Sequence, residues 1–218
     1  MKRFWKTIIL SMLLALTLCV GAQATENTML KVGLKYGTNA LFTARLQNYN
    51  DTLSGSGYEF GYYDADRSFV PLAATDEQRI TVTVDSNASV SGGVCYETRP
   101  TNYSPILGAY HIELLTAFGS YEEALAVAQS YPKGFVAYID GAYRVRVGNH
   151  ASYDESARVL SETDVLAYGA QIVTPSSTGV VVSVTDTDTV LFEFDCSGLR
   201  SLGVRPRSVS GEKTVTWF

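Results

Sequence analysis

The chain carries one pattern twice, and this repetition restricts its fold more than any other feature. Residues 108–114 and 141–147 each begin with a glycine and continue with alternating apolar and polar side chains. This alternation is typical of a half-buried strand. A serine follows each segment, Ser120 in one case and Ser152 in the other, with a glutamate three residues later. That spacing is the capping-box pattern of a helix start. Two strand-to-helix units in tandem therefore predict a small βαββαβ domain.

Turn and helix-stop residues place the other elements of this domain. The Asp140-Gly141 pair is the strongest short-range signal for a β-hairpin, and it follows an apolar run. Prolines end a helix or a strand because they cannot continue either one. The expected elements are a first helix that ends before Pro132, a strand over residues 135–139, a second helix from about 154 to 167, and a strand over residues 170–174.

The alternation within the strands predicts two chemically different sheet faces. Successive side chains of a strand point to opposite faces. Apolar residues of the first and third strands therefore share one face, and His111, Glu113, Arg144 and Arg146 share the other. Because the apolar face must cover the two helices, the polar face is expected to be open.

Residues 143–157 carry a resemblance to a known family. Their order is an aromatic residue, alternating Val and Arg, Gly148, a short loop, Ser152 and an acidic helix start with Ala157. This resembles the second half of a sporulation-related repeat (SPOR) domain. The first half departs from the pattern, since Glu113 stands where Gln is common and residues 115–118 replace the usual Gly-Ser-Phe with one extra residue. The resemblance implies a ferredoxin-like module that binds peptidoglycan glycan strands stripped of their stem peptides.

A sugar polymer offers hydroxyls, amides and apolar ring faces, so its site needs rigid donors and polar partners. Arginines supply such donors, and polar residues of the adjacent strand and of the following loop would add contacts. The candidate glycan-binding residues are His111, Glu113, Arg144, Arg146, Asn149 and His150. The alternative is that Arg146 and Glu113 form a cross-strand ion pair on a solvated face, which would stabilise little.

The first 24 residues have the features of a secretory signal peptide. A basic start precedes an apolar segment over residues 8–20, and Ala22-Gln-Ala24 is a small-x-small cleavage site. The protein is therefore expected to be secreted to the cell envelope, with membrane contact only if the leader stays uncleaved. The leader holds three of the 17 basic residues and none of the 22 acidic ones, so the mature chain has a formal net charge of −8. This acidity argues against a nucleic-acid partner.

Two β-rich regions flank the repeat domain. Strand patterns occur at residues 30–36, 40–46, 57–63 and 80–84, and a hairpin pattern occurs at residues 180–184 and 190–194. Gly61 interrupts an aromatic strand, which indicates a bulge or a close backbone approach. The predicted organisation is a signal peptide (1–24), a β-rich region (29–91), a connector (92–106), the βαββαβ domain (107–175) and a second β-rich region (180–218) that packs with the first. The fold class is α+β.

The strand patterns at residues 30–36 and 57–63, together with the segment from 191–194 to 216–218, resemble the N-terminal β-rich part of clostridial proteins of the stage II sporulation protein D family. In that family a sporulation-related repeat can be inserted in this region, and a lytic transglycosylase domain follows. The helix that carries the catalytic Glu in those proteins, rich in Pro, Glu, Ala and Gln, has no counterpart in this sequence. The resemblance implies the targeting part of such a protein without its catalytic part.

The sequence contains no recognisable catalytic or metal-binding constellation. Glu59, Glu97, Glu113 and Glu193 are the candidate acids for glycan cleavage, and each has an ordinary surface explanation. Asp186 and Asp188 lack the Gly and distant Glu of a calcium loop, and no Cys/His cluster has zinc spacing. No enzyme activity, metal or cofactor is therefore predicted. Export would permit a disulfide between Cys95 and Cys196, and two isolated thiols are an equal alternative.

The sequence thus predicts an exported protein that binds cell-wall glycan, targeted to septal or sporulation peptidoglycan. Two alternatives remain open. The chain could be the truncated targeting half of a lytic transglycosylase, which sequence downstream of Phe218 would reveal. The repeat could instead be a protein-docking module or an RNA-recognition-like sheet, although export and acidity count against RNA.

Overall fold

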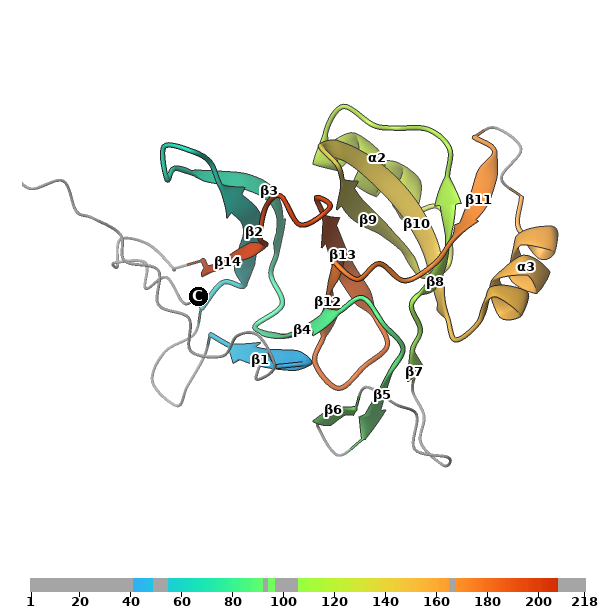
Figure 1. Ribbon diagram of the computed structural model, residues 1–218, viewed down its shortest axis with the longest axis horizontal. Helices are drawn as coiled ribbons and strands as arrows, with labels where there is room; N and C mark the ends of the chain where they lie inside the picture. Colours follow the sequence, from blue (N-terminus) through green and yellow to red (C-terminus); the bar gives the residue numbers. More distant parts are fainter. Residues whose placement is uncertain (1–40, 49–54, 92–93, 97–105, 165–167, 208–218) are drawn as a thin grey trace, which may run out of the picture. The chain divides into compact units, whose positions relative to one another are not determined.

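In the computed structural model, the protein is described over residues 41–48, 55–91, 94–96, 106–164 and 168–207 (Figure 1). These residues all belong to one compact unit, Gly33–Phe218. The predicted leader, the expected strand at 30–36 and the last eleven residues lie outside the described part of the chain. Neither of the described helices is long and apolar enough to cross a membrane.

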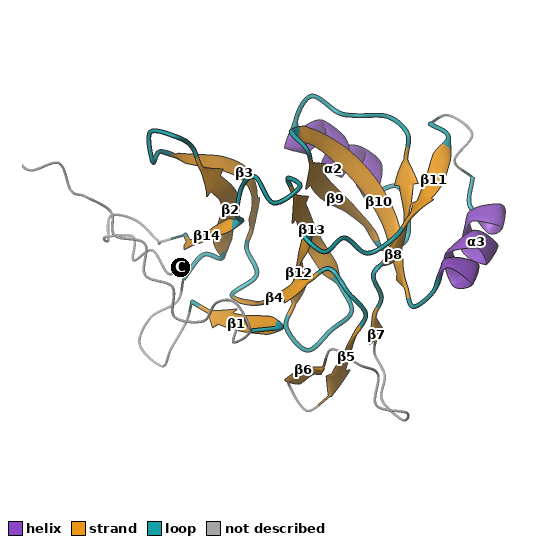
Figure 2. Cartoon of the chain, viewed as in Figure 1, coloured by secondary structure: helices purple, strands orange, loops and turns teal. Residues whose placement is uncertain are grey.

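The architecture is β-rich α+β, with three sheets and two described helices (Figure 2). The large sheet contains, in spatial order, β1 (Thr43–Gln47), β4 (Arg79–Val84), β12 (Val180–Val184), β13 (Val190–Asp195), β9 (Gly134–Ile139), β10 (Ala142–His150), β8 (Tyr110–Leu114) and β11 (Ala170–Val173). The two smaller sheets contain β14 (Gly203–Pro206), β2 (Tyr58–Tyr63) and β3 (Phe69–Thr75), and β6 (Val94–Tyr96), β5 (Ala88–Ser91) and β7 (Ile106–Leu107). The helices are α2 (Tyr121–Ala128) and α3 (Tyr153–Glu162).

The repeated pattern forms the predicted succession of two strand-to-helix units. In chain order the elements are β8, α2, β9, β10, α3 and β11, and the four strands lie side by side in the order β9-β10-β8-β11 with antiparallel neighbours. Helix α2 packs on β9 and β10, and α3 packs on β8, β10 and β11. Asp140 and Gly141 both take positive φ angles, 46° and 92°, so the hairpin between β9 and β10 is built as the sequence predicts.

Both helices begin with the same set of hydrogen bonds. The Ser120 hydroxyl accepts from the backbone N–H of Glu123 at 3.2 Å, and the Ser152 hydroxyl accepts from that of Glu155 at 3.2 Å. Each glutamate side chain reaches back to a backbone N–H just before its serine, that of Gly119 or Ala151. These hydrogen bonds confirm the predicted capping pattern in both units. Caps of this kind satisfy backbone N–H groups at the helix start that have no partner within the helix.

We expect Ser120→Ala and Ser152→Ala each to lower the free energy of unfolding by about 1 kcal/mol, since each removes the acceptor at a helix start. Urea denaturation of the two single variants measures the loss. Ser161→Ala is the matched control, because the Ser161 hydroxyl bonds only within α3, to the carbonyl of Arg158, and lies far from the cap. An equal loss in all three variants would contradict the assignment of the stabilisation to the caps.

Two local predictions differ from the structure. Helix α3 ends at Glu162 because Thr163 takes an extended backbone (φ −97°, ψ 128°), so the expected helix to residue 167 is too long. The expected connector contains strands, since β5 pairs with both β6 and β7. The Ser, Gly and Asn composition of this segment predicts a loop. Its short strands form because their backbones pair with one another, which composition does not indicate.

The flanking segments join the βαββαβ unit edge to edge. Strand β13 pairs with β9 in parallel, and β12 pairs with both β13 and β4. Strand β14 pairs with β2 across a long separation in sequence. The unit's own sheet thus continues into the β-rich segments on either side of it, which is a feature that local sequence patterns do not predict.

The apolar core lies on the face of the sheet that carries α2. Phe60 of β2 stacks on Phe192 of β13 with ring centroids 5.7 Å apart, and Tyr121 of α2 meets Phe192 edge-on at 6.3 Å. Tyr62 likewise stacks on Tyr138 of β9. The register of β2 against β3 shifts between Phe60 and Gly61, so the predicted bulge at Gly61 is confirmed. The aromatic residues of the β2 segment serve packing.

Candidate functional site

The polar face of the βαββαβ unit is not open. His111, Glu113 and Arg146 are each more than nine-tenths buried, and Asn149 is 9% exposed. The sequence-based expectation of an open face is therefore wrong for His111, Glu113 and Arg146, and Asn149, expected in a loop, lies buried within β10. Side chains from distant strands meet those of the unit over this face, because Glu193 of β13 contacts Arg146, and Asp85, which follows β4, has a ligand-type atom within 4.8 Å of those of His111 and Glu193.

A buried ion network replaces the expected solvated pair. Arg146 contacts Glu113 through Nε and Nη2, both 2.8 Å from the same carboxylate oxygen, and its Nη1 donates to Glu193. Gln171 donates to the other oxygen of Glu113 at 3.2 Å. Burial alone would lower the pKa of Arg146, but Glu193 and Glu113 raise it above its ordinary value. Arg146 thus stays charged between two carboxylates from different parts of the chain.

A second buried group lies beside this network. Asp85 follows β4, His111 lies in β8 and Glu193 in β13, and one ligand-type atom of each lies within 4.8 Å of the others. Burial raises the pKa of Asp85 to about 7, and Glu193 adds to the effect, while the backbone N–H of Ser176 opposes it. Burial likewise lowers the pKa of His111. Burial thus favours the neutral form of Asp85 and of His111.

The other predicted site residues lie apart from this interior. Arg144 is half-buried and donates to the backbone carbonyl of Leu115 at 3.2 Å. His150 lies with Nδ1 3.8 Å from a Glu155 oxygen, and burial lowers its pKa although Glu155 opposes that shift. Asn149 donates to the backbone carbonyl of Asp188 at 2.6 Å. Of the six candidates, the structure brings three together, His111, Glu113 and Arg146.

The candidate acids have different environments. Glu193 is fully buried, so the surface explanation given to it, and to the buried Glu113, is wrong. Glu59 pairs with Arg205 at 2.7 Å. Glu97 lies outside the described residues. Cys196 is a buried free thiol.

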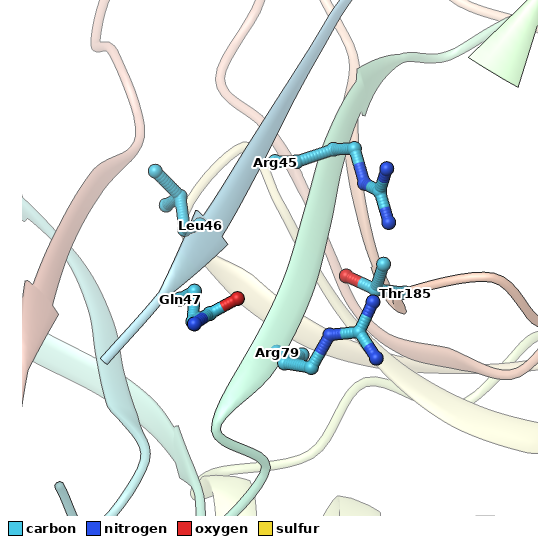
Figure 3. Close-up of a pocket in the computed structure, with 5 residues that line it drawn as sticks. All are labelled: Arg45, Leu46, Gln47, Arg79 and Thr185. Carbon is cyan, nitrogen blue, oxygen red and sulfur yellow. The ribbon is translucent and has the colours of Figure 1, made fainter. Parts of the chain in front are cut away.

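A pocket of about 370 Å³ lies at the edge of the large sheet (Figure 3). Its lining residues come from β1, β4 and the loop after β12: Arg45, Leu46, Gln47, Arg79 and Thr185. In Figure 3 the guanidinium groups of Arg45 and Arg79 lie on either side of Thr185, and Leu46 projects to the other side of β1. Asp186 accepts from both arginines at 3.1 Å, from Arg45 on both carboxylate oxygens and from Arg79 on Oδ2.

This pocket presents an excess of positive charge on a partly solvated surface. The side chains of Arg45, Arg79 and Asp186 are each about two-fifths exposed, and two guanidinium groups share one carboxylate. Arginine is suited to bind a further carboxylate because its planar donors match the two oxygens. Sequence reasoning missed this site, since nothing in residues 45 and 79 indicates that β1 pairs with β4.

Comparison of the chain with protein-family models, with curated proteins and with solved structures found no match.

Proposed function

We propose that this protein is an exported, non-catalytic protein that binds the glycan strands of the cell wall. The observation that carries the proposal is the βαββαβ unit, in which two strands each lead into a serine-capped helix and the spatial order is β9-β10-β8-β11. The resemblance to sporulation-related repeats implies a ferredoxin-like module, and this element order supports that proposal. Export, and with it access to the cell wall, is proposed from the leader pattern at residues 1–24.

The burial of the unit's polar face changes where the glycan would bind. His111, Glu113 and Arg146 are enclosed by the protein, and Arg146 pairs with Glu113, so these residues cannot form a glycan surface. The pocket of Arg45, Gln47 and Arg79 has the required chemistry on an accessible surface. It combines two rigid cationic donors with an amide and a hydroxyl, which suit the amides and hydroxyls of a sugar polymer.

The pocket also accounts for a preference for stripped glycan. Removal of a stem peptide from a muramyl residue leaves a free lactyl carboxylate on the sugar. Two arginines that share the single carboxylate of Asp186 can bind a second one, with charge-assisted hydrogen bonds. An intact stem peptide turns that carboxylate into an amide and removes the charge.

The test is a pull-down of the exported protein with purified peptidoglycan sacculi, before and after an amidase removes the stem peptides. We expect binding to rise on stripping. Arg45→Ala with Arg79→Ala should lower the affinity for stripped sacculi by about tenfold or more, because each hydrogen bond to a charged group contributes about 1.5–3 kcal/mol. Arg158→Ala is the matched control, since Arg158 is an exposed arginine on α3, away from the pocket lining, that pairs with Glu162.

Two outcomes would overturn parts of this proposal. Absence of binding to sacculi in either form would refute glycan binding. Loss of binding in Arg144→Ala, with normal binding in the Arg45 and Arg79 double variant, would place the glycan on β10 and not in the pocket. The single Arg144→Ala variant suits this comparison because Arg144 is not part of the buried ion network.

A further inference from the structure

Three buried polar atoms on neighbouring side chains have no hydrogen-bond partner within the described part of the chain. They are Oδ1 of Asp85, Nε2 of His111 and Oε2 of Glu193, and each lies on a residue at most 4% exposed. The Nε2 and Oε2 atoms are 3.8 Å apart, and the three residues can present ligand atoms within 4.8 Å of one another. An unpaired polar group in the interior is costly, so three at one point indicate that they bind something together.

The hydrogen bond of His111 prepares its ring for a metal ion. Nδ1 lies 2.6 Å from the backbone carbonyl oxygen of Gly148, and a carbonyl can only accept. Nδ1 therefore carries the proton, and Nε2 presents its lone pair toward Glu193 and Asp85. A histidine that donates its other ring N–H to a carbonyl is the usual arrangement around a bound metal.

The two carboxylates are held in the same way. The second oxygen of Asp85 accepts from the backbone N–H of Ser176 at 2.7 Å, and the second oxygen of Glu193 accepts from Arg146. Each of the three side chains is thus oriented by one partner through one atom, and its other atom has no hydrogen-bond partner within the described residues. Outer contacts of this kind fix the ligands of metal sites.

The charges at this point also leave room for a cation. Glu113, Glu193 and Asp85 bring three carboxylates into the interior, whereas Arg146 brings one positive charge. With His111 neutral, the group carries one excess negative charge while Asp85 is protonated, and release of that proton on metal binding leaves two excess negative charges. A divalent cation would balance them, and buried charges persist when they are paired or coordinate a metal.

We propose that Asp85, His111 and Glu193 form a buried binding site for one Zn²⁺ ion, which links the end of β4 to β8 and β13. Mixed nitrogen and oxygen ligands suit Zn²⁺, whereas Mg²⁺ and Ca²⁺ prefer oxygen alone and more ligands. Zinc bonds of about 2.0–2.2 Å require the ligand atoms to approach closer than 3.8 Å, which rotation of the two carboxylates supplies. The site does not depend on the proposed glycan binding.

The experiment measures zinc in the exported protein, purified without a histidine tag and dialysed against metal-free buffer after loading with ZnCl₂. We expect one zinc per chain by mass spectrometry of the metal. We also expect the thermal midpoint to rise by about 5–10 °C when free Zn²⁺ exceeds its dissociation constant about 100-fold. Asp85→Asn and His111→Gln should each lower the zinc affinity at least about tenfold.

The matched control is His150→Gln, which changes the other histidine of the chain and should bind zinc like the unmodified protein. If a buried variant fails to fold, titration of the unmodified protein with ZnCl₂, CaCl₂ and MgCl₂ decides, because only zinc should raise its midpoint at micromolar concentration. Zinc content well below one per chain with no shift of the midpoint would overturn the proposal. Zinc loss in His150→Gln equal to that in His111→Gln would overturn it as well.

Discussion

Arg146→Met is expected to lower the free energy of unfolding by about 3–5 kcal/mol, because it removes the cation from a buried network and leaves two carboxylates without it. Arg146 is 7% exposed and contacts both Glu113 and Glu193. Methionine replaces the aliphatic stem of arginine with a flexible apolar chain, so much of the volume stays filled and the loss reports mainly the missing charge. Chemical denaturation in a buffer with EDTA measures it, since the chelator prevents a metal ion from compensating for the lost charge.

The comparison variants separate a buried ion pair from an exposed one. Arg158→Met breaks the pair with Glu162 on the surface of α3, where both side chains are more than three-fifths exposed, and should cost only about 0.3–0.5 kcal/mol. Neutralising the carboxylates by Glu113→Gln and Glu193→Gln in the Arg146→Met background should recover stability. If Arg146→Met costs no more than Arg158→Met, the network contributes little and the polar face must be open to water.

The sequence predicts well what neighbouring residues decide. Serine caps, the Asp140-Gly141 turn and the strand alternation each act within a few residues, so the order and type of the elements from β8 to β11 follow from them. The length of α3 is less well predicted, because Thr163 leaves the helix although the apolar pattern continues. Short strands in the Ser- and Gly-rich segment before residue 107 give too weak a local signal to be recognised.

The candidate site is poorly predicted because it depends on pairing between distant segments. Strand β13 reads as a hairpin strand in which Glu193, between two phenylalanines, points to water. Its parallel pairing with β9 instead places Glu193 beside Arg146, so both faces of the sheet are buried there. A strand with one polar residue between two aromatic residues can have that polar residue in water or in the interior. The local sequence is the same for both, and the strand that it pairs with decides between them.

The second large effect on stability is expected from a substitution in the aromatic core. Phe192→Ala is expected to lower the free energy of unfolding by about 3–5 kcal/mol, since it removes a fully buried ring and leaves a cavity. Phe192 contacts Phe60 of the β2 sheet and Tyr121 of α2. These residues belong to a flanking β-rich segment and to the βαββαβ unit, so the substitution should weaken both together. Far-ultraviolet and tyrosine circular dichroism should therefore report one unfolding transition, shifted equally in both signals.

A double-mutant cycle with Phe60→Ala tests the contact directly. The stacked rings should contribute a coupling free energy of about 0.5–1.5 kcal/mol beyond the area that they bury. Leu199→Ala is the control, because Leu199 is 87% exposed and its truncation should change stability by less than about 0.5 kcal/mol. Two separate transitions, of which Phe192→Ala shifts only one, would contradict a shared core. In that case the βαββαβ unit would fold independently of the strands around it, and the burial of its polar face by β13 would be a docking of two domains that could reopen to bind a ligand.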